Sequence, residues 1–163
     1  MKLQGRKVIK GSIVVNIPFN EMCVVFADDK FMRTLQDGVT KFEIPYDKNG
    51  LKVLHVVMQL PGPVSNREMV VVNSYRNEGD KVYVGNRSCK FPVAVDKDAV
   101  QAELMVGGFI LDKMDETKTM VTNISDVDIK GAIPDFVVNA MSKKRVEMLY
   151  DIEKRIKAYQ GKK

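Results

Sequence analysis

The fold is decided by residues 125–160, which read SDVDIKGAIPDFVVNAMSKKRVEMLYDIEKRIKAYQ. A strand-like run ends at Ile129, Lys130 and Gly131 turn the chain, and Pro134 stands where a helix tolerates a missing N–H. Since neither Pro nor Gly follows in residues 135–159, this segment is predicted to form one helix about 37 Å long.

One face of this predicted helix is apolar. Its apolar residues recur at steps of three and four, with a single interruption at Arg145: Val138, Met141, Met148, Leu149, Ile152, Ile156 and Tyr159. Charged residues occupy the other faces. A long helix with one apolar side must lie on an equally long apolar surface, and the preceding chain has to supply it.

The preceding chain is predicted to form strands in hairpin order. Residues 8–17 alternate as a strand, and residues 19–36 read as a helical pair broken near Asp28. The further predicted strands are 40–46, 51–60, 68–76, 81–89, 102–111 and 118–127. This order predicts an α+β fold in which an antiparallel, curved sheet of about seven strands wraps around the long C-terminal helix and leaves a cavity against it.

Composition limits the possible functions. The 163 residues fit one domain, 1–163, and the 45% hydrophobic and 29% charged residues are ordinary for a globular protein. Residues 1–10 hold no apolar stretch typical of a secretory signal, and two cysteines without metal-ligand spacing favour a reduced, cytoplasmic setting. The net charge of +5 suits an anionic membrane surface better than nucleic acid, because no nucleic-acid-binding motif is present.

Two short motifs resemble the START lipid-transfer domain. Residues 63–70 read PVSNREMV, similar to P-x-S-x-R-D-F-V of that family. Residues 128–134 read DIKGAIP, similar to D-x-K-G-W-I-P, and Val138-Asn139 matches the V-N of its last helix. The order of elements agrees from residue 7 to 159. The resemblance therefore implies the helix-grip fold and a non-enzymatic lipid-binding or lipid-transfer function.

The chain departs from the family pattern at several positions. Glu68 stands for the family's Asp, Ala132 for its Trp, and residues 100–103 lack the Arg of a V-R-G-type sequence. The family's first helix and first two strands have no counterpart before residue 8, so the chain resembles either a short variant or a piece of a longer protein.

The resemblance implies a ligand cavity between one sheet face and the inner side of the last helix. The predicted lining residues are His55, Met69, Val71, Asn73, Val84, Phe109, Asn123, Val138, Met141, Arg145 and Leu149. Each apolar residue of this set, taken alone, is also explained as an ordinary residue of the hydrophobic core.

Two polar positions leave alternatives open. Asn73 and His55 are expected to form a neutral pair that binds a ligand hydroxyl, although His55 reads equally well as a surface or satisfied core residue. Arg145 either faces inward, where it needs a carboxylate or an anionic head group, or extends to solvent.

A gate is predicted in the loop of Leu60, Pro61, Gly62, Pro63 and Val64, over the first half of the last helix. Leu60 and Val64 suit brief insertion into a membrane interface, and Lys143, Lys144 and Lys154 suit its anionic surface. The alternative is that both apolar residues pack into the core.

The predicted function is therefore to hold one hydrophobic ligand, such as a phospholipid or sterol, and exchange it at membranes as a monomer. No catalytic, metal-binding or cofactor-binding pattern is expected from the sequence. Two alternatives remain: an enzyme on the same fold, such as a cyclase or hydrolase that uses His55 and Tyr75, and a ligand-dependent interaction module.

Overall fold

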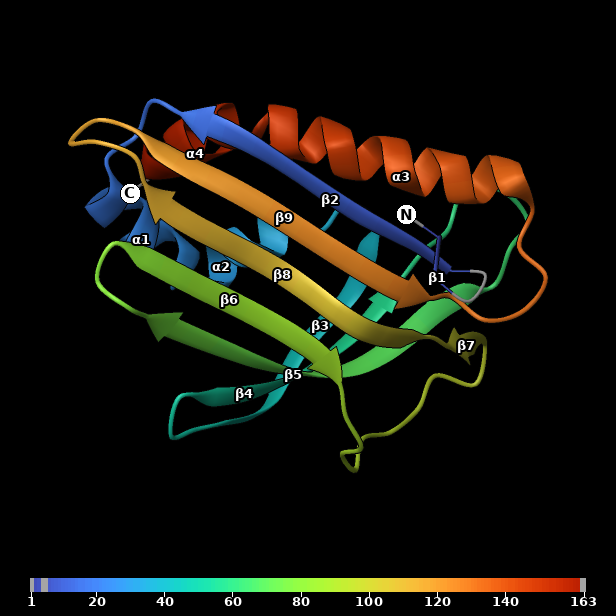
Figure 1. Ribbon diagram of the computed structural model, residues 1–163. Coiled ribbons are helices and arrows are strands. Elements are labelled where there is room, and N and C mark those ends of the chain that lie inside the picture. The colour runs from blue at the N-terminus through green and yellow to red at the C-terminus, as the bar shows by residue number, and fades with distance from the viewer. Residues whose placement is uncertain (1, 4–5, 162–163) are drawn as a thin grey trace.

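The computed structural model describes residues 2–3 and 6–161 (Figure 1). The ends of the predicted domain 1–163 lie outside these residues. Within them the strands are β1 Lys2–Leu3, β2 Arg6–Val15, β3 Val39–Lys48, β4 Leu51–Met58, β5 Asn66–Asn77, β6 Lys81–Ser88, β7 Ala99–Gln101, β8 Glu103–Lys113 and β9 Thr119–Asp128. The helices are α1 Phe19–Phe26, α2 Asp29–Thr34, α3 Asp135–Tyr150 and α4 Ile152–Gln160.

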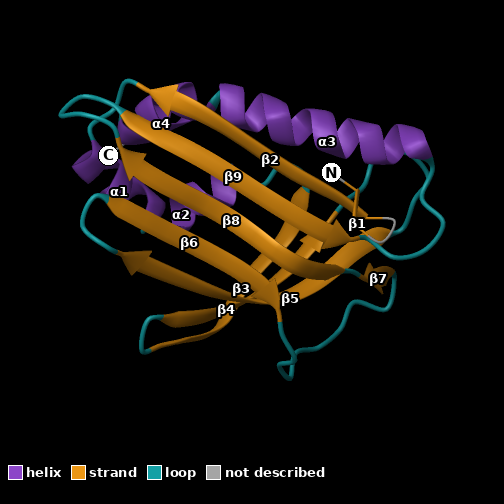
Figure 2. Cartoon of the chain, in the orientation of Figure 1, coloured by secondary structure: helices purple, strands orange, loops and turns teal. Residues whose placement is uncertain are grey.

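The strands form one curved sheet in the order β1-β2-β9-β8-β6-β5-β4-β3, with β7 added beside β5. Every pairing is antiparallel except that of β7 with β5. Figure 2 shows α3 and α4 end to end along the β2 side of the sheet. The predicted helix-grip fold is confirmed, and its seven long strands correspond to β2–β6, β8 and β9.

The prediction of a single C-terminal helix is wrong in one detail, because the helix is interrupted at Asp151. This residue has φ −85° and ψ 0°, and it separates α3 from α4. Its amide still donates to the Glu147 carbonyl at 2.9 Å, and the Arg155 amide donates to the Asp151 carbonyl at 2.9 Å. The apolar stripe therefore continues across the break. The predicted break near Asp28 is confirmed between α1 and α2.

The core is solid at one end of the molecule. There α1, α2 and α4 pack on β6, β8 and β9, and the ring of Phe26 makes edge contacts with Phe31 and Phe109 at centroid distances of 5.6 and 5.2 Å. Ile152 and Ile156 of α4 are fully buried in the same cluster. Under α3, by contrast, the lining side chains leave a cavity. No helix in the described part of the chain is long and apolar enough to cross a membrane.

The solid end should carry most of the stability. Ile152→Ala removes a side chain that is 0% exposed, so we expect the free energy of unfolding to fall by about 2–5 kcal/mol. Urea denaturation measures this change. Tyr150→Ala, two residues earlier and 73% exposed, is the matched control and should shift the value by less than about 0.5 kcal/mol. Equal effects of the two substitutions would contradict this description of the core.

Candidate functional site

A cavity of about 210 Å³ lies between the inner face of the sheet and α3. Its apolar lining includes residues of four strands, β4, β5, β8 and β9, and of α3: Leu54, Val56, Met58, Met69, Val71, Leu104, Phe109, Val127, Val138, Met141 and Met148. Four of these are methionines, whose unbranched side chains adapt to different ligand shapes. The volume is below the roughly 300–1,000 Å³ typical of small-molecule sites, so a bulky ligand requires the walls to move.

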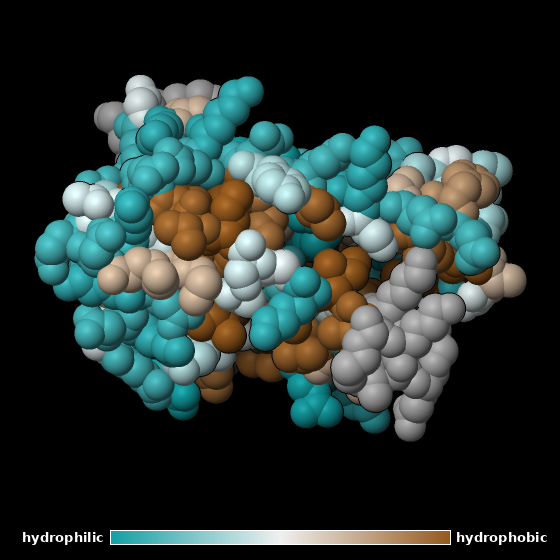
Figure 3. All heavy atoms as spheres, turned by 45° about the horizontal axis from the view of Figure 1, so that its top comes forward, coloured by the Kyte–Doolittle hydropathy of each residue, from teal (hydrophilic) through white to brown (hydrophobic). Residues whose placement is uncertain are grey.

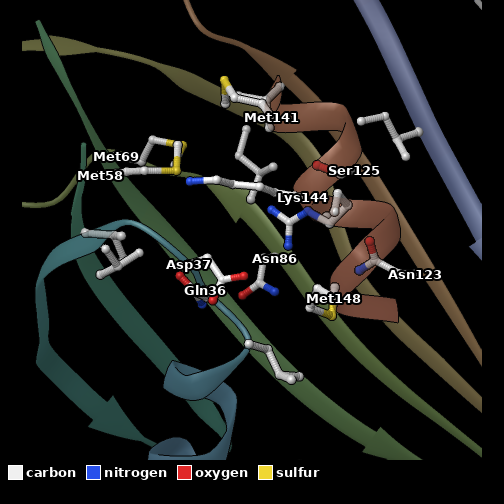
Figure 4. Close-up of a pocket in the computed structure, with 18 of the residues that line it drawn as sticks. Gln36, Asp37, Met58, Met69, Asn86, Asn123, Ser125, Met141, Lys144 and Met148 are labelled. Atoms are coloured by element: carbon white, nitrogen blue, oxygen red, sulfur yellow. The ribbon is translucent and has the colours of Figure 1, made fainter. Parts of the chain in front are cut away.

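Polar groups gather at one part of this lining. Figure 4 shows Lys144 extending from α3 across the cavity toward Met58 and Met69, with Asp37, Gln36 and Asn86 nearby. Asp37 is the only carboxylate residue among the described lining residues. It accepts hydrogen bonds from both terminal nitrogens of Arg155 at 3.2 and 3.0 Å. The cavity lining therefore contains cationic side chains, while its carboxylate residue, Asp37, is already paired with Arg155.

The side chain of Arg145 on α3 faces the cavity. It is half-buried and lines the cavity, and in the described part of the chain it makes neither a hydrogen bond nor an ion pair. Burial lowers the pKa of its guanidinium, and the negative charge of Asp37 partly opposes that shift. Of the two alternatives for Arg145, the structure shows the inward one.

Asn123 on β9 has one unsatisfied polar atom. Its amide nitrogen donates to the Gly108 carbonyl at 2.9 Å, which fixes the orientation of the amide group. Its Oδ1 is buried and has no hydrogen-bond partner in the described structure. An acceptor in this state lowers stability unless a donor reaches it, so the site is suited to a ligand or water that supplies an O–H or N–H.

A second hollow, which we call the surface groove, lies between β2 and α3. Its lining includes Ile9, Gly11, Ile13, Val146, Leu149 and Tyr150. Arg145 and Asn123 line the groove as well as the cavity, so the two hollows meet at these side chains. Figure 3 views the face that carries α3 and β2 and shows hydrophobic surface among hydrophilic residues.

Most predicted lining residues reach one of the hollows. Met69, Val71, Phe109, Asn123, Val138, Met141 and Arg145 line the cavity, whereas Leu149 lines the groove. Their contact with a ligand stays a prediction.

Val84 is not in either lining, because it is buried in the solid core. In the gate loop, Leu60 and Pro61 line the cavity, while Gly62, Pro63 and Val64 lie outside the lining.

The predicted Asn73–His55 pair does not form. Asn73 donates to the side chain of Asn86 at 2.8 Å, and Asn86 in turn lines the cavity. His55 belongs to the opposite face of β4, because the alternation that turns Leu54 and Val56 inward turns His55 outward. Its predicted place in the lining is therefore corrected.

On that outer face His55 joins a buried polar cluster around Glu68. Its Nε2 lies 2.5 Å from Glu68 Oε1, and its Nδ1 lies 3.4 Å from Glu43. The Asp96 amide donates to both Glu68 oxygens at 3.1 and 3.2 Å, and Gln101 donates to the same carboxylate. Burial alone would raise the pKa of Glu68, but the hydrogen bonds from His55, Asp96 and Gln101 together lower it.

The neighbouring residue Arg67 joins two segments that are distant in the sequence. Its guanidinium donates to main-chain carbonyls: Ser65 and Ile129 at 2.5 Å and Lys130 at 3.1 Å. These bonds connect the segment just after the gate loop to the turn that precedes α3. That turn requires Lys130 and Gly131 at φ 51° and 77°.

Tyr75, the other candidate for acid–base chemistry, is also outside both linings. Its hydroxyl donates to the Cys23 carbonyl at 3.3 Å, and burial raises its pKa to about 12. A tyrosine with this pKa stays protonated at neutral pH. Within the described residues, no group of His, Cys, Asp and Glu side chains is placed to hold a metal ion.

Sequence reasoning missed several polar lining residues. Asp37 lies in the turn that follows α2. Asn86 lies on β6, the strand on which Val84 was the only residue predicted to line the cavity. The alternation that places Val84 inward also places Asn86 inward, so this residue could have been found. No local pattern indicates that the α2–β3 connection reaches the cavity.

Comparison with known proteins gives a consistent family. The sequence profile of the START domain matches residues 43–161. START domain-containing protein 10 of mouse and of human are each 25% identical to the chain over 129 residues, which is 78% of this chain and 44% of either relative. The chain thus spans less than half the length of these relatives.

Solved structures show the same fold. A crystal structure of human STARD10 has a TM-score of 0.79 at 22% identity and covers 95% of this chain and 66% of that one. Human StAR-related lipid transfer protein 5 has a TM-score of 0.80 at 17% identity, with coverage of 94% and 76%. A STAR-related lipid transfer protein from Xanthomonas axonopodis reaches 0.72 at 18% identity, and 96% of each chain is covered.

The polar cluster on the outer face should make stability depend on pH. Glu68→Gln keeps the size of the side chain but removes its charge, and we expect the free energy of unfolding at pH 7 to fall by about 2 kcal/mol. Because the folded pKa of Glu68 is lowered, its contribution is complete above its ordinary pKa of 4.5 and is lost as the pH falls through the folded value. The difference between the two proteins should therefore narrow below that pH.

Urea denaturation across the acidic range measures this difference. Glu43→Gln is the matched control, since Glu43 is 57% exposed and approaches the other nitrogen of the same histidine. It should change stability by less than about 1 kcal/mol. Parallel pH curves for wild type and Glu68→Gln would contradict the role given to Glu68.

Proposed function

Since this chain belongs to the START domain family, we propose that it holds one lipid in the cavity under α3 and exchanges it at membrane surfaces. The observation that carries the proposal is the methionine-rich apolar cavity enclosed between the sheet and α3. Burial of an acyl chain there gains about 0.8 kcal/mol per methylene group. The catalytic alternative has no comparable support, because His55 and Tyr75 both lie away from the cavity.

Exchange requires an opening, and the gate loop is the candidate. Leu60 is 3% exposed and forms part of the cavity wall, so the loop closes the cavity with an apolar side chain. Gly62 has φ 81°, and a Cβ placed on it would lie 3.4 Å from Cζ of Phe136 in the first turn of α3. The loop therefore rests on the start of the helix.

The same end of the molecule presents apolar surface to a membrane. Phe136 is 59% exposed beside the exposed Gly62 and Pro63. Lys143 and Lys144 lie on the same helix and are exposed. Each contributes roughly 1 kcal/mol of attraction to an anionic surface. Apolar insertion by Phe136 and Val64, assisted by these lysines, would bring the gate to the lipid.

The identity of the cargo is tested by extracting the protein purified from cells and analysing its lipids by mass spectrometry. We expect one lipid class in near-stoichiometric amount. A protein that carries no lipid, and that acquires none from mixed vesicles, would contradict the proposal.

The gate is tested by lipid transfer between vesicles with and without anionic lipid. Val64→Asp and Phe136→Asp should each slow transfer about tenfold, because an acid replaces an apolar group worth roughly 1.5–3 kcal/mol at the interface. Equilibrium lipid binding and the unfolding midpoint should stay unchanged. Val24→Asp on α1 is the matched control, since Val24 is 66% exposed and lies away from the gate, at the α1 end. Equal slowing by the control, or unchanged rates for both gate variants, would contradict this assignment.

A further inference from the structure

We propose that the ligand is a single-chain lipid with an anionic head group, and that Arg145 and Asn123 bind this head where the cavity meets the surface groove. The inference rests on the proposed function and names the ligand class of the same site. It follows from four observations: the position of the two side chains, the local balance of charge, the unpaired acceptor of Asn123 and the size of the cavity.

The position of the two side chains marks a boundary between apolar and polar surroundings. On one side lies the methionine-rich cavity, and on the other the groove, whose lining includes Lys10 and Ser12 as well as Tyr150, 73% exposed. Arg145 and Asn123 line both hollows. An amphiphile bound with its chain in the cavity places its head at these residues and leaves that head an open path along the groove.

The charge balance at this boundary calls for an anion. Arg145 and Lys144 contribute two positive charges to the lining, and Asp37 is the one carboxylate residue found there within the described chain. Asp37 already forms two hydrogen bonds with Arg155, so its negative charge compensates Arg145 only in part. A half-buried guanidinium without a partner is unfavourable, whereas a carboxylate or phosphate accepts two parallel hydrogen bonds from it.

Asn123 adds a requirement for a donor. Its Oδ1 is buried and unpaired, and the bond from its nitrogen to Gly108 prevents the amide from turning around. A hydroxyl group next to the anion satisfies this acceptor. A head of glycerol phosphate type carries both features, while a fatty acid carries only the anion.

The size of the cavity favours one acyl chain over two. At about 210 Å³ it is smaller than the usual range for small-molecule sites, and its wall at Leu60 is closed by the gate loop. A single flexible chain can thread between methionine side chains that rearrange around it. The neutral, two-chain lipids lack both the charge and the slender shape that this site offers.

The test is displacement of a fluorescent fatty acid from the full chain by matched single-chain lipids. The set contains oleate, 1-oleoyl-lysophosphatidate, oleyl phosphate and the neutral 1-oleoylglycerol, with dioleoylphosphatidylcholine as the two-chain lipid. We expect the anionic lipids to bind at least about tenfold more tightly than 1-oleoylglycerol. Lysophosphatidate should bind about threefold more tightly than oleyl phosphate because of its hydroxyl group. Asn123→Ala should remove this preference for lysophosphatidate over oleyl phosphate.

Arg145→Met should reduce the preference for anionic over neutral lipid to less than about threefold, and Arg145→Lys should retain part of it. Lys157→Met is the matched control, because it removes one positive charge from α4 at a side chain that is 60% exposed, pairs with Glu153 and lines neither hollow. Its preference should equal that of wild type. An unfolding curve for each variant confirms that binding is compared between folded proteins.

The outcomes separate this inference from the proposed function. Equal binding of 1-oleoylglycerol and the anionic lipids by wild type, or a tenfold preference that persists in Arg145→Met, overturns the inference. Tight binding of dioleoylphosphatidylcholine with no effect of Arg145→Met overturns the inference but supports lipid carriage. Failure of the fluorescent fatty acid and of every lipid in the set to bind overturns both.

Discussion

The guanidinium of Arg67 joins the start of β5 to the turn that precedes α3. Its hydrogen bonds to Ser65, Ile129 and Lys130 connect two segments that are more than sixty residues apart in the sequence. Since Arg67 is 3% exposed and its partners are main-chain carbonyls, the junction depends on backbone geometry rather than on a second charge. Because α3 begins shortly after this turn, the junction fixes the start of the helix relative to β5.

The two C-terminal helices differ in how completely they pack against the sheet. At its far end the packing is complete, because α1 and α2 supply Phe26 and Phe31 to fill the space under α4. Under α3 no such layer is available, and the apolar stripe meets only the curved sheet and a few flexible side chains. The solid half therefore provides the stability that allows the other half to stay hollow. Stability and binding are separated along one helix, with Met148 at the boundary between them.

The sequence predicts most of this arrangement, for reasons that can be stated residue by residue. Hairpin turns and alternation place the long strands, and steps of three and four place Val138, Met141 and Leu149 on the inner side of the helix. Asn73 and His55 could not be paired correctly, because register across β4 and β5 depends on the exact length of the loop between them: His55 lies opposite Val70, and Asn73 opposite Lys52. The break at Asp151 could not be predicted, because neither Pro nor Gly occurs there. Arg145 was recognisable as a break in the stripe, but the stripe alone does not tell whether its side chain turns inward or extends to solvent.

The adjacency of Arg67 and Glu68 fixes β5 on both of its faces. Successive residues of a strand point to opposite faces, so Arg67 binds main-chain carbonyls on the inner face while Glu68 accepts hydrogen bonds from His55, Gln101 and the Asp96 amide on the outer face. Strand β5 is thus fixed on both faces, and β4 is fixed to it through His55. A wall held in this way does not move to admit a ligand. The freedom that remains lies in the segments without such bonds, namely the gate loop with its glycine at positive φ and the methionines that line the cavity. A site built from a rigid polar frame and a compliant apolar lining admits slender, flexible ligands more readily than broad, rigid ones.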